Sequence, residues 1–580
     1  GIKDGALINE LALSTAMKVV GVDRDTSRVA ALRRKMETKN WRNLTRPSIQ
    51  HVNDYEKLPY VDGIFNLVTS EHRSLRLPGA ELQRLLRPYD GIAALNNQIH
   101  RAREVPAAGG WTHIYGDPGN SASSGGDRLP DGPLRPQWFG APGPHHMVDR
   151  HLRAPPPLAA NGFLFVPGRE YLFGIDAFNG TILWEQQIEN FTRVAVLRDG
   201  GNLALAKDNS LYAAAGPDCL EIDANTGNRL RKFSVDSESQ EWGYLAIGGV
   251  NDELLIGSAS PTGAIRRKLA TVSIFSGAYG DRQRIVCSES LFALARKSGT
   301  RQWDYRPRGM IFNPSLCIHS GRIFFLESND PQTLVAPGSH DGDRSDTVAS
   351  GKARRVAGRW HYSDLIESKG ATIVALALDS GRPLWRKPLE MQSGIQTLFL
   401  SCAADQLVVV DSRNGPVSGK DGRVTLHYDT QVYDPANGQR RWQHTFDTGR
   451  GKDLTHGEQD LHPVITGEML IVEPQVYELA TGKPLFTFRR SGGGGCGALS
   501  ASASRLYYRA SHPTTFDLQD RKQQKIANVS RPGCWINMIP ASGLLLIPEG
   551  SSGCICSYPI QASMAFRPGR VVGSGEKSGR

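Results

Sequence analysis

The 580-residue sequence contains no run of 18 apolar residues, which excludes a transmembrane helix. It also lacks a dense cluster of one charge. Lys and Arg outnumber Asp and Glu (68 against 58), but the basic residues are scattered, so we interpret them as a solvated surface and expect no nucleic-acid partner. No signal peptide is visible, which leaves open that one has been removed ahead of Gly1.

The sequence lacks the cysteine spacings that are typical of zinc sites and of quinone-binding disulfides. The sequence has eight cysteines but no adjacent Cys-Cys pair and no C-x-x-C motif. Four cysteines fall near the end of the chain: Cys496, Cys534, Cys554 and Cys556. We predict that these form disulfides, which indicates an oxidising compartment, while a zinc site and buried free thiols stay open as alternatives. Cys554 and Cys556 would share one face of a strand, so each is expected to pair elsewhere.

Glycine (62) and proline (34) are abundant, as is typical of short strands joined by tight turns. One pattern occurs six times: a strand, a turn glycine, and a fixed position four residues later. The glycines are Gly180, Gly227, Gly299, Gly381, Gly438 and Gly482, and the fixed positions hold Trp184, Arg231, Trp303, Trp385, Trp442 and Phe486. A weaker seventh copy spans 514–525. Because alternation in a strand puts the aromatic ring on one face, we expect it to wedge between neighbouring sheets.

These repeats, such as "IDAFNGTILW", resemble the quinoprotein-like (PQQ-like) β-propeller family, whose blades carry an A-x-D-x-x-T-G-x-x-x-W repeat. The resemblance predicts a mainly β fold with seven or eight four-stranded blades over residues 134–568. "LRPQWFGAPG" at 134–143 is expected to close the ring with the C-terminal strands, and residues 569–580 are expected to be a disordered tail. The resemblance also implies a periplasmic or otherwise extracytoplasmic location.

Residues 1–100 differ from the repeats, because short apolar strands alternate with helical stretches, which predicts a small α/β domain. This part resembles the Rossmann-like S-adenosylmethionine (SAM) methyltransferases: "GIKDG" stands at the glycine loop, and an acidic residue closes the second strand eighteen residues later. The resemblance implies a SAM site built from Gly1, Gly5, Asp23 and Asp54. The strand that should precede the loop is absent and Lys3 replaces the middle glycine, so we interpret the domain as vestigial or structural.

Residues 101–133 are rich in Pro, Gly and Ser and read as a linker. After them comes "GPHHMVDRHLRAPPP", in which His145, His146, Asp149 and His151 lie within seven residues. Such clusters hold first-row metals, and in a strand residues 145, 149 and 151 would share a face. The alternative is a polar loop at the rim of the propeller, in which the imidazoles are only hydrogen-bonded.

Three functions stay open. The leading hypothesis is an extracytoplasmic scaffold that binds a protein or a small-molecule ligand at the propeller face. The first alternative is an oxidoreductase that uses pyrroloquinoline quinone (PQQ) or a divalent metal. Related quinone enzymes clamp the cofactor with an adjacent Cys-Cys disulfide, which this sequence lacks. The second alternative is a SAM-dependent methyltransferase.

Overall fold

The structure is a computed structural model that describes residues 2–39, 41, 45–72, 75–125, 133–148, 155–194, 196–267, 284–335, 356–366, 369–391, 395–418, 423–451, 462–490, 497–526, 529–530, 532–533, 535–548 and 562–569. The chain divides into two compact units, Gly1–Pro106 and Ala107–Arg580. None of the helices in these described ranges combines the length and the apolar character that a membrane span requires.

The first unit is a small α/β domain. Its helices are α1 (Ala6–Ser14), α2 (Thr26–Glu37) and α3 (Gly79–Leu85), and its strands are β1 (Val20–Asp23), β2 (Ser48–His51), β3 (Leu67–Thr69), β4 (Ile92–Leu95) and β5 (Gln98–Arg101). The expected alternation of helices and strands is present. The strands form two sheets rather than one, however: β1 pairs with β2 in parallel, and β3 pairs with β4 in parallel. The strand β5, which the sequence pattern did not indicate, adds an antiparallel edge to β4.

The second unit consists of consecutive antiparallel sheets, which we number in chain order. Sheet 1 has β7 (Leu158–Ala160), β8 (Phe163–Pro167), β9 (Tyr171–Asp176) and β10 (Ile182–Gln187). Sheet 2 has β11 (Leu203–Leu205), β12 (Ser210–Ala215), β13 (Asp218–Asp223) and β14 (Arg229–Ser234). Sheet 3 has β15 (Gln240–Gly248), β16 (Leu254–Pro261), β18 (Ser290–Ala295) and β19 (Arg301–Tyr305). Sheet 4 has β17 (Ile285–Ser288), β20 (Ile311–Phe312), β21 (Cys317–His319), β22 (Arg322–Ser328), β23 (Arg359–Trp360), β24 (Ala371–Ala377) and β25 (Pro383–Pro388).

The remaining sheets each have four strands. Sheet 5 has β26 (Ile395–Ala403), β27 (Gln406–Ser418), β28 (Arg423–Tyr433) and β29 (Arg440–Gly451). Sheet 6 has β30 (Val464–Thr466), β31 (Met469–Val472), β32 (Gln475–Glu478) and β33 (Pro484–Thr487). Sheet 7 has β34 (Ser500–Ala501), β35 (Arg505–Ala510), β36 (His512–Asp517) and β37 (Gln523–Lys525). Sheet 8 has β38 (Ile539–Ala541), β39 (Leu544–Ile547), β40 (Ser563–Pro568) and β6 (Leu134–Gly140). Short helical turns lie between strands: α4 (Val196–Asp199), the 3-10 turns η2 (Asn313–Ser315) and η3 (Pro331–Leu334), and α6 (Tyr362–Ile366).

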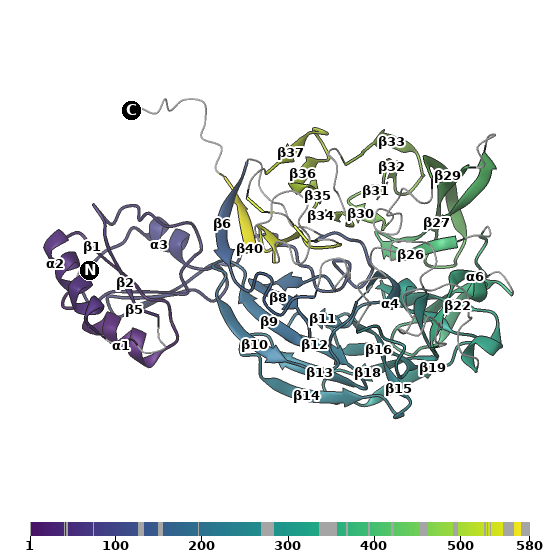
Figure 1. The fold of residues 1–580 in the computed structure, drawn as a ribbon, viewed down its shortest axis with the longest axis horizontal. Helices are drawn as coiled ribbons and strands as arrows, with labels where there is room; N and C mark the ends of the chain where they lie inside the picture. Colours follow the sequence, from purple (N-terminus) through teal and green to yellow (C-terminus); the bar gives the residue numbers. More distant parts are fainter. Residues whose placement is uncertain are drawn as a thin grey trace, which may run out of the picture. The chain divides into compact units, whose positions relative to one another are not determined.

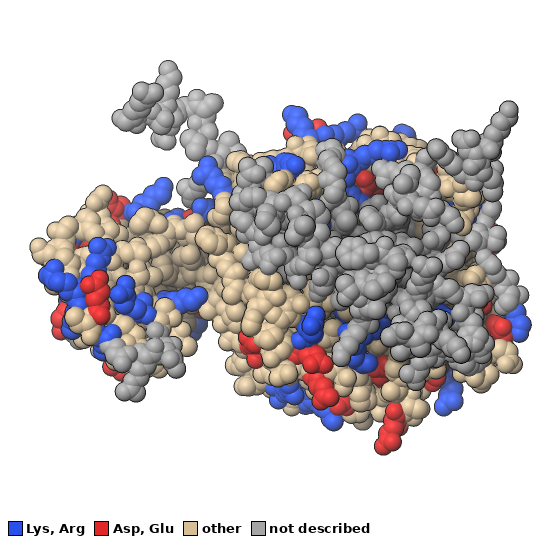
Figure 2. Space-filling view, in the orientation of Figure 1, with Lys and Arg blue, Asp and Glu red and all other residues tan. Residues whose placement is uncertain are grey.

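The sheets follow one another round a ring, which is the architecture of a β-propeller (Figure 1). The ring closes as the sequence predicted, because β6 from the start of the unit pairs antiparallel with β40 from its end. Apolar side chains fill the seams between sheets. At the seam between sheets 3 and 4, for example, Ile256 and Trp303 share one buried cluster with Ile323, Phe325 and Val374. On the face seen in Figure 2, basic and acidic side chains of the described residues are interspersed.

At five of the seams, a tryptophan fastens one sheet to the next, as the repeat pattern predicted. We call this contact the tryptophan latch: the ring lies against the turn glycine of the following sheet, and the indole N–H donates to the carbonyl three residues before that glycine. The pairs are Trp138 with Gly180, Trp184 with Gly227, Trp303 with Gly381, Trp385 with Gly438 and Trp442 with Gly482. These glycines have φ between 65° and 74°, and a Cβ on any of them would lie within 2.7 Å of the ring. Glycine therefore serves both the turn and the packing.

Candidate functional site

The segment 109–124, "GGWTHIYGDPGNSASS", lies at the centre of the ring; we call it the central segment. The first strands of neighbouring sheets contact one another, so they line this centre. Hydrogen bonds join the central segment to all eight sheets. In six of them the partner lies in the first strand. In sheet 4 it lies in β21, and in sheet 8 it is the residue that follows β38. In order along the segment, the partners are Ser542, Ala159, Leu205, Ile247, Ile318, Cys402, Ile465 and Ala501. The circuit starts at sheet 8 and continues through sheets 1 to 7, so the segment closes the centre at this level.

Buried side chains hold the central segment in place. The Nε2 atom of His113 accepts a hydrogen bond from the backbone N–H of Ile247 at 3.0 Å. Burial lowers the pKa of His113 to about 3, so the ring is neutral and keeps that acceptor near pH 7. The Asn120 amide donates to the carbonyl oxygens of Leu316 and Leu400, at 2.9 and 3.1 Å. One side chain thereby ties sheets 4 and 5 to the segment.

Tyr115 of the central segment takes part in an aromatic stack. The ring of Tyr115 stacks on His462 with centroids 3.8 Å apart, and Phe399 meets His462 edge-on at 4.8 Å. All three side chains are buried, and burial raises the pKa of Tyr115 above its usual range while it lowers that of His462 to about 3. The stack is therefore uncharged near neutral pH.

This closed centre does not fit the quinone alternative. The latch tryptophans lie in the outermost strands of their sheets, so they are committed to seam packing. Cys317 and Cys402 are free, buried thiols, and burial raises the pKa of each, which makes them poor nucleophiles. At the level of the central segment, the side chains of Trp111 and Tyr115 are buried.

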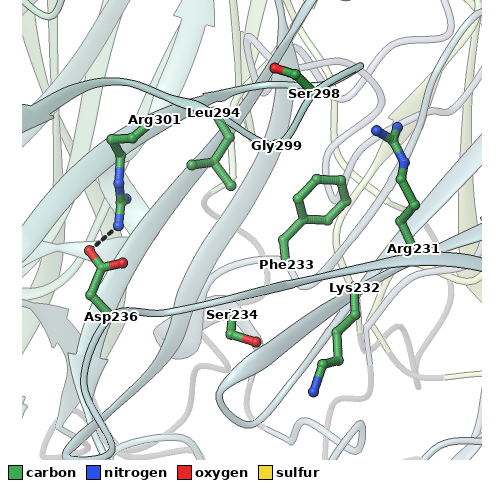
Figure 3. Close-up of a pocket in the computed structure, with 9 residues that line it drawn as sticks. All are labelled: Arg231, Lys232, Phe233, Ser234, Asp236, Leu294, Ser298, Gly299 and Arg301. Atoms are coloured by element: carbon green, nitrogen blue, oxygen red, sulfur yellow. Dashed lines mark hydrogen bonds and ion pairs between the residues drawn. The ribbon is translucent and has the colours of Figure 1, made fainter.

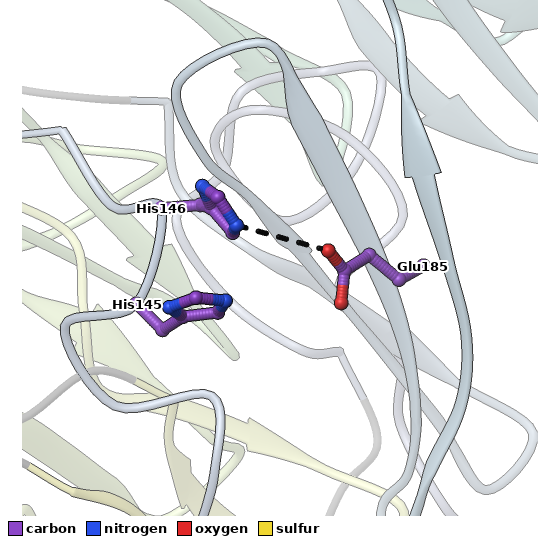
Figure 4. Close-up of side chains that lie close together, drawn as sticks. All are labelled: His145, His146 and Glu185. Carbon is purple, nitrogen blue, oxygen red and sulfur yellow. Dashed lines mark ion pairs between the residues drawn. The ribbon is translucent and has the colours of Figure 1, made fainter.

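Two of the four predicted metal ligands come together, and a third residue that the sequence did not indicate joins them. The ligand atoms of His145, His146 and Glu185 all lie within 4.8 Å of one another (Figure 4). Residues 143–146 form a turn rather than the strand that the spacing argument assumed. Asp149 and His151 lie outside the described residues. Glu185 follows the repeat tryptophan Trp184, and no local motif distinguishes it from other exposed strand residues.

In the first unit, the carboxylates of the predicted SAM-site residues Asp23 and Asp54 already accept hydrogen bonds from the chain itself. The Asp23 carboxylate accepts from the backbone N–H of Ile2 at 3.1 Å and forms an ion pair with Arg28 at 3.0 Å. These bonds outweigh burial and lower the pKa of Asp23. Gly5 lies at the N-terminus of α1 with φ of 77°, so the predicted loop does contain a glycine-specific conformation. Asp54 caps its own turn through the N–H of Glu56 at 2.8 Å, and Gly1 lies outside the described residues.

The four cysteines predicted to form disulfides, at positions 496, 534, 554 and 556, all lie outside the described residues. Residues 570–580, which make up almost all of the predicted tail, also lie outside them. The predicted linker divides at the boundary between the units: residues 107–125 belong to the second unit, where they include the central segment. Their Gly, Ser and Pro content suits tight turns as well as a linker, which is why composition did not separate the two.

A cavity of about 440 Å³ lies at the seam between sheets 2 and 3, where Arg231 replaces the latch tryptophan (Figure 3). Arg231 donates to the carbonyl oxygen of Arg296 at 2.6 Å. This carbonyl lies three residues before the turn glycine Gly299, and it corresponds to the carbonyl that accepts from the indole N–H at the latch seams. Phe233 covers Gly299 instead, at 3.3 Å from where its Cβ would be. Arg231, the position of the six repeats without an aromatic ring, therefore leaves an opening that we call the seam pocket.

Comparisons with known proteins agree with the repeat architecture. Residues 135–310 match the model of a PQQ-like repeat family described as outer membrane protein assembly factor BamB. No curated protein sequence matches the chain. Among solved structures, BamB from Moraxella catarrhalis is 12% identical, with a TM-score of 0.42, over 75% of this chain and 100% of that one. A quinohemoprotein alcohol dehydrogenase from Comamonas testosteroni is 10% identical, with a TM-score of 0.43, over 79% of this chain and 80% of that one. The sheet topology makes the second unit a β-propeller, and its residues 135–310 are similar to PQQ-like repeats.

Proposed function

We propose that this chain is an extracytoplasmic binding scaffold for a protein partner, and that its eight sheets are the blades of an eight-bladed propeller. The observation that carries the proposal is the central segment, which bonds to all eight sheets. In open propellers the central mouth is a natural concave site for a cofactor or substrate. Here the chain fills that site itself, so recognition is left to the outer loops and the seams.

A protein partner is favoured by the match of residues 135–310 to a family described as an outer membrane protein assembly factor. That description also supports the extracytoplasmic location. We place the partner at the seam pocket, because it is a cavity that opens where a packing aromatic is missing. Most of the pocket lining is polar, with Lys232 and Asp236 exposed at its rim and the buried side chains of Phe233 and Leu294 at its base, so we propose that charged groups of the partner bind there.

The methyltransferase-like head is proposed to be structural. In the resemblance, Asp23 would bind the ribose hydroxyls of SAM, but its carboxylate is held by Arg28 and by the N–H of Ile2. A ligand would have to displace both contacts. We therefore expect no methyl transfer by this domain.

Two sets of experiments test the proposal. Purified full-length protein is titrated with PQQ plus Ca²⁺, followed by absorbance, and with SAM, followed by calorimetry; no binding is expected in either case. Stoichiometric PQQ with alcohol-dependent dye reduction would favour the oxidoreductase, and SAM binding would favour the methyltransferase.

The partner is then sought by cross-linking in the cell envelope of the host. One specific cross-linked protein should be lost in Lys232→Glu and kept in Lys483→Glu, an exposed lysine in the turn before β33. A cross-linking pattern that both variants share would count against the seam pocket.

A further inference from the structure

The turn after β6 brings two neighbouring histidine rings to one side of the backbone. In an extended strand the side chains of His145 and His146 would point to opposite faces. His146 instead has φ of 56°, a left-handed conformation that few residues other than glycine adopt. The ring centroids of the two histidines are 3.9 Å apart as a result. A side chain in this conformation is strained, so the surrounding contacts must hold it.

Contacts with sheet 1 hold His146 in this position. Its carbonyl oxygen accepts a hydrogen bond from the N–H of Arg169 at 2.6 Å. Its ring stacks on Tyr171 with centroids 3.8 Å apart and planes 17° from parallel. The ring therefore loses little further freedom when it binds a ligand, which favours preorganised coordination.

Glu185 completes the group from the outer strand of the same sheet. It lies in β10 opposite Phe173 of β9, and its carboxylate oxygen is 3.9 Å from the Nε2 atom of His146. Figure 4 shows the carboxylate and both imidazoles turned toward one space. All three side chains are at least partly exposed, so an ion can reach them from solvent.

We propose that His145, His146 and Glu185 form a binding site for a divalent first-row cation, with Zn²⁺ the best match. Two imidazoles and one carboxylate are the ligand set that Zn²⁺ commonly takes, and a fourth position remains for water or another ligand. The site joins the turn that follows the closing strand β6 to sheet 1. Bound metal would therefore clamp the ring at its closure, beside the latch of Trp138. This inference is independent of the proposed scaffold function.

The test is Zn²⁺ binding to the full-length chain, measured by calorimetry after removal of metal with a chelator. We expect one site per chain whose affinity falls roughly tenfold or more in Glu185→Gln and in His145→Asn. Glu189→Gln serves as the matched control, because Glu189 is an exposed glutamate just beyond the same strand. His319→Asn controls for single histidine–carboxylate pairs, since His319 lies 3.4 Å from Asp405 and belongs to no group of three candidate ligands among the described residues.

Two further readouts keep the test independent of folding defects. Glu185 is exposed on an outer strand, so Glu185→Gln should keep the wild-type unfolding temperature without metal but lose the increase that Zn²⁺ gives the wild type. Co²⁺ in place of Zn²⁺ should give the visible absorption of a site with imidazole and carboxylate ligands in the wild type and in Glu189→Gln. Equal Zn²⁺ affinity in wild type, Glu185→Gln and His145→Asn would overturn the proposal.

Discussion

The ring of Trp303 lies against Gly381 of the following sheet, and its indole N–H donates to the carbonyl oxygen of Leu378 at 2.8 Å. The same relationship recurs at four other seams, so each of these sheets is fastened to the next by one aromatic ring and one hydrogen bond. Burial of the ring and satisfaction of its donor act together here.

The latch predicts that Gly381→Ala is far more damaging than an equivalent change in an open turn. The new Cβ would lie 2.6 Å from the Trp303 ring, and the residue has φ of 65°. Gly321 is the control, because it has φ of 71° and nothing within 4 Å of its Cβ position. Both substitutions share the backbone strain, so Gly381→Ala should cost about 1–3 kcal/mol more. Urea unfolding of the two variants measures this, and equal costs would contradict the latch.

The seam between sheets 6 and 7 predicts a coupling between two residues. Arg521 stands at the turn-glycine position with φ of 54°, and its guanidinium lies 4.5 Å from the ring centroid of Phe486, which replaces the tryptophan. Phe486→Trp alone should destabilise the protein, because the Arg521 side chain occupies the space. In the Arg521→Gly background the same change should be neutral or stabilising. A double-mutant cycle should give about 1 kcal/mol or more of favourable coupling, and purely additive effects would refute it.

The buried carboxyl group of Asp411 should make the free energy of unfolding fall as pH rises. It lies opposite Asp429 across β27 and β28, and burial, with a smaller contribution from the Asp429 charge, raises its pKa well above the usual value despite Arg413. Between the ordinary pKa and the raised one, the unfolded chain is ionised while the folded chain keeps the proton. Folded stability is therefore lost as pH rises through this window. Urea unfolding at pH 5 and pH 8 measures this. The free energy of unfolding of Asp411→Asn, relative to that of the wild type, should be higher at pH 8 than at pH 5. A difference that is the same at both pH values would contradict this.

The buried ring of His462 should have the opposite effect, so that the free energy of unfolding falls as pH falls. Burial lowers its pKa to about 3, so its contribution is complete above the ordinary value near 6.5 and is lost as pH falls toward 3. The loss reaches at most about 1.4 kcal/mol for each pH unit. His462→Phe keeps an aromatic ring against Tyr115 and removes the titration. Thermal unfolding at pH 7 and pH 4.5 should show a smaller acid-induced drop for this variant, and an unchanged drop would count against the buried neutral ring.

The hairpins and seams could be predicted from sequence because their signals are local. Asp176, Gly180 and Trp184 fall within nine residues and set both a turn and a packing position. The central segment carries no such signal. Asn120 bonds to Leu400, which is 280 residues away, and almost all of the segment's partners are backbone groups that any sequence offers. For the same reason Glu185 could not be recognised: the fold alone brings it to His145 and His146.

The central claim is that residues 109–124 close the centre of the ring, and amide hydrogen exchange of the protein tests it most directly. The amides of Trp111, Ala122 and Ser124 donate to carbonyl groups, and those of Ile318 and Cys402 donate to the segment. Peptides from 109–124 should exchange as slowly as peptides from the inner strands β26 and β30. Exchange of this segment within seconds, while β26 and β30 stay protected, would show an open centre and would contradict the account.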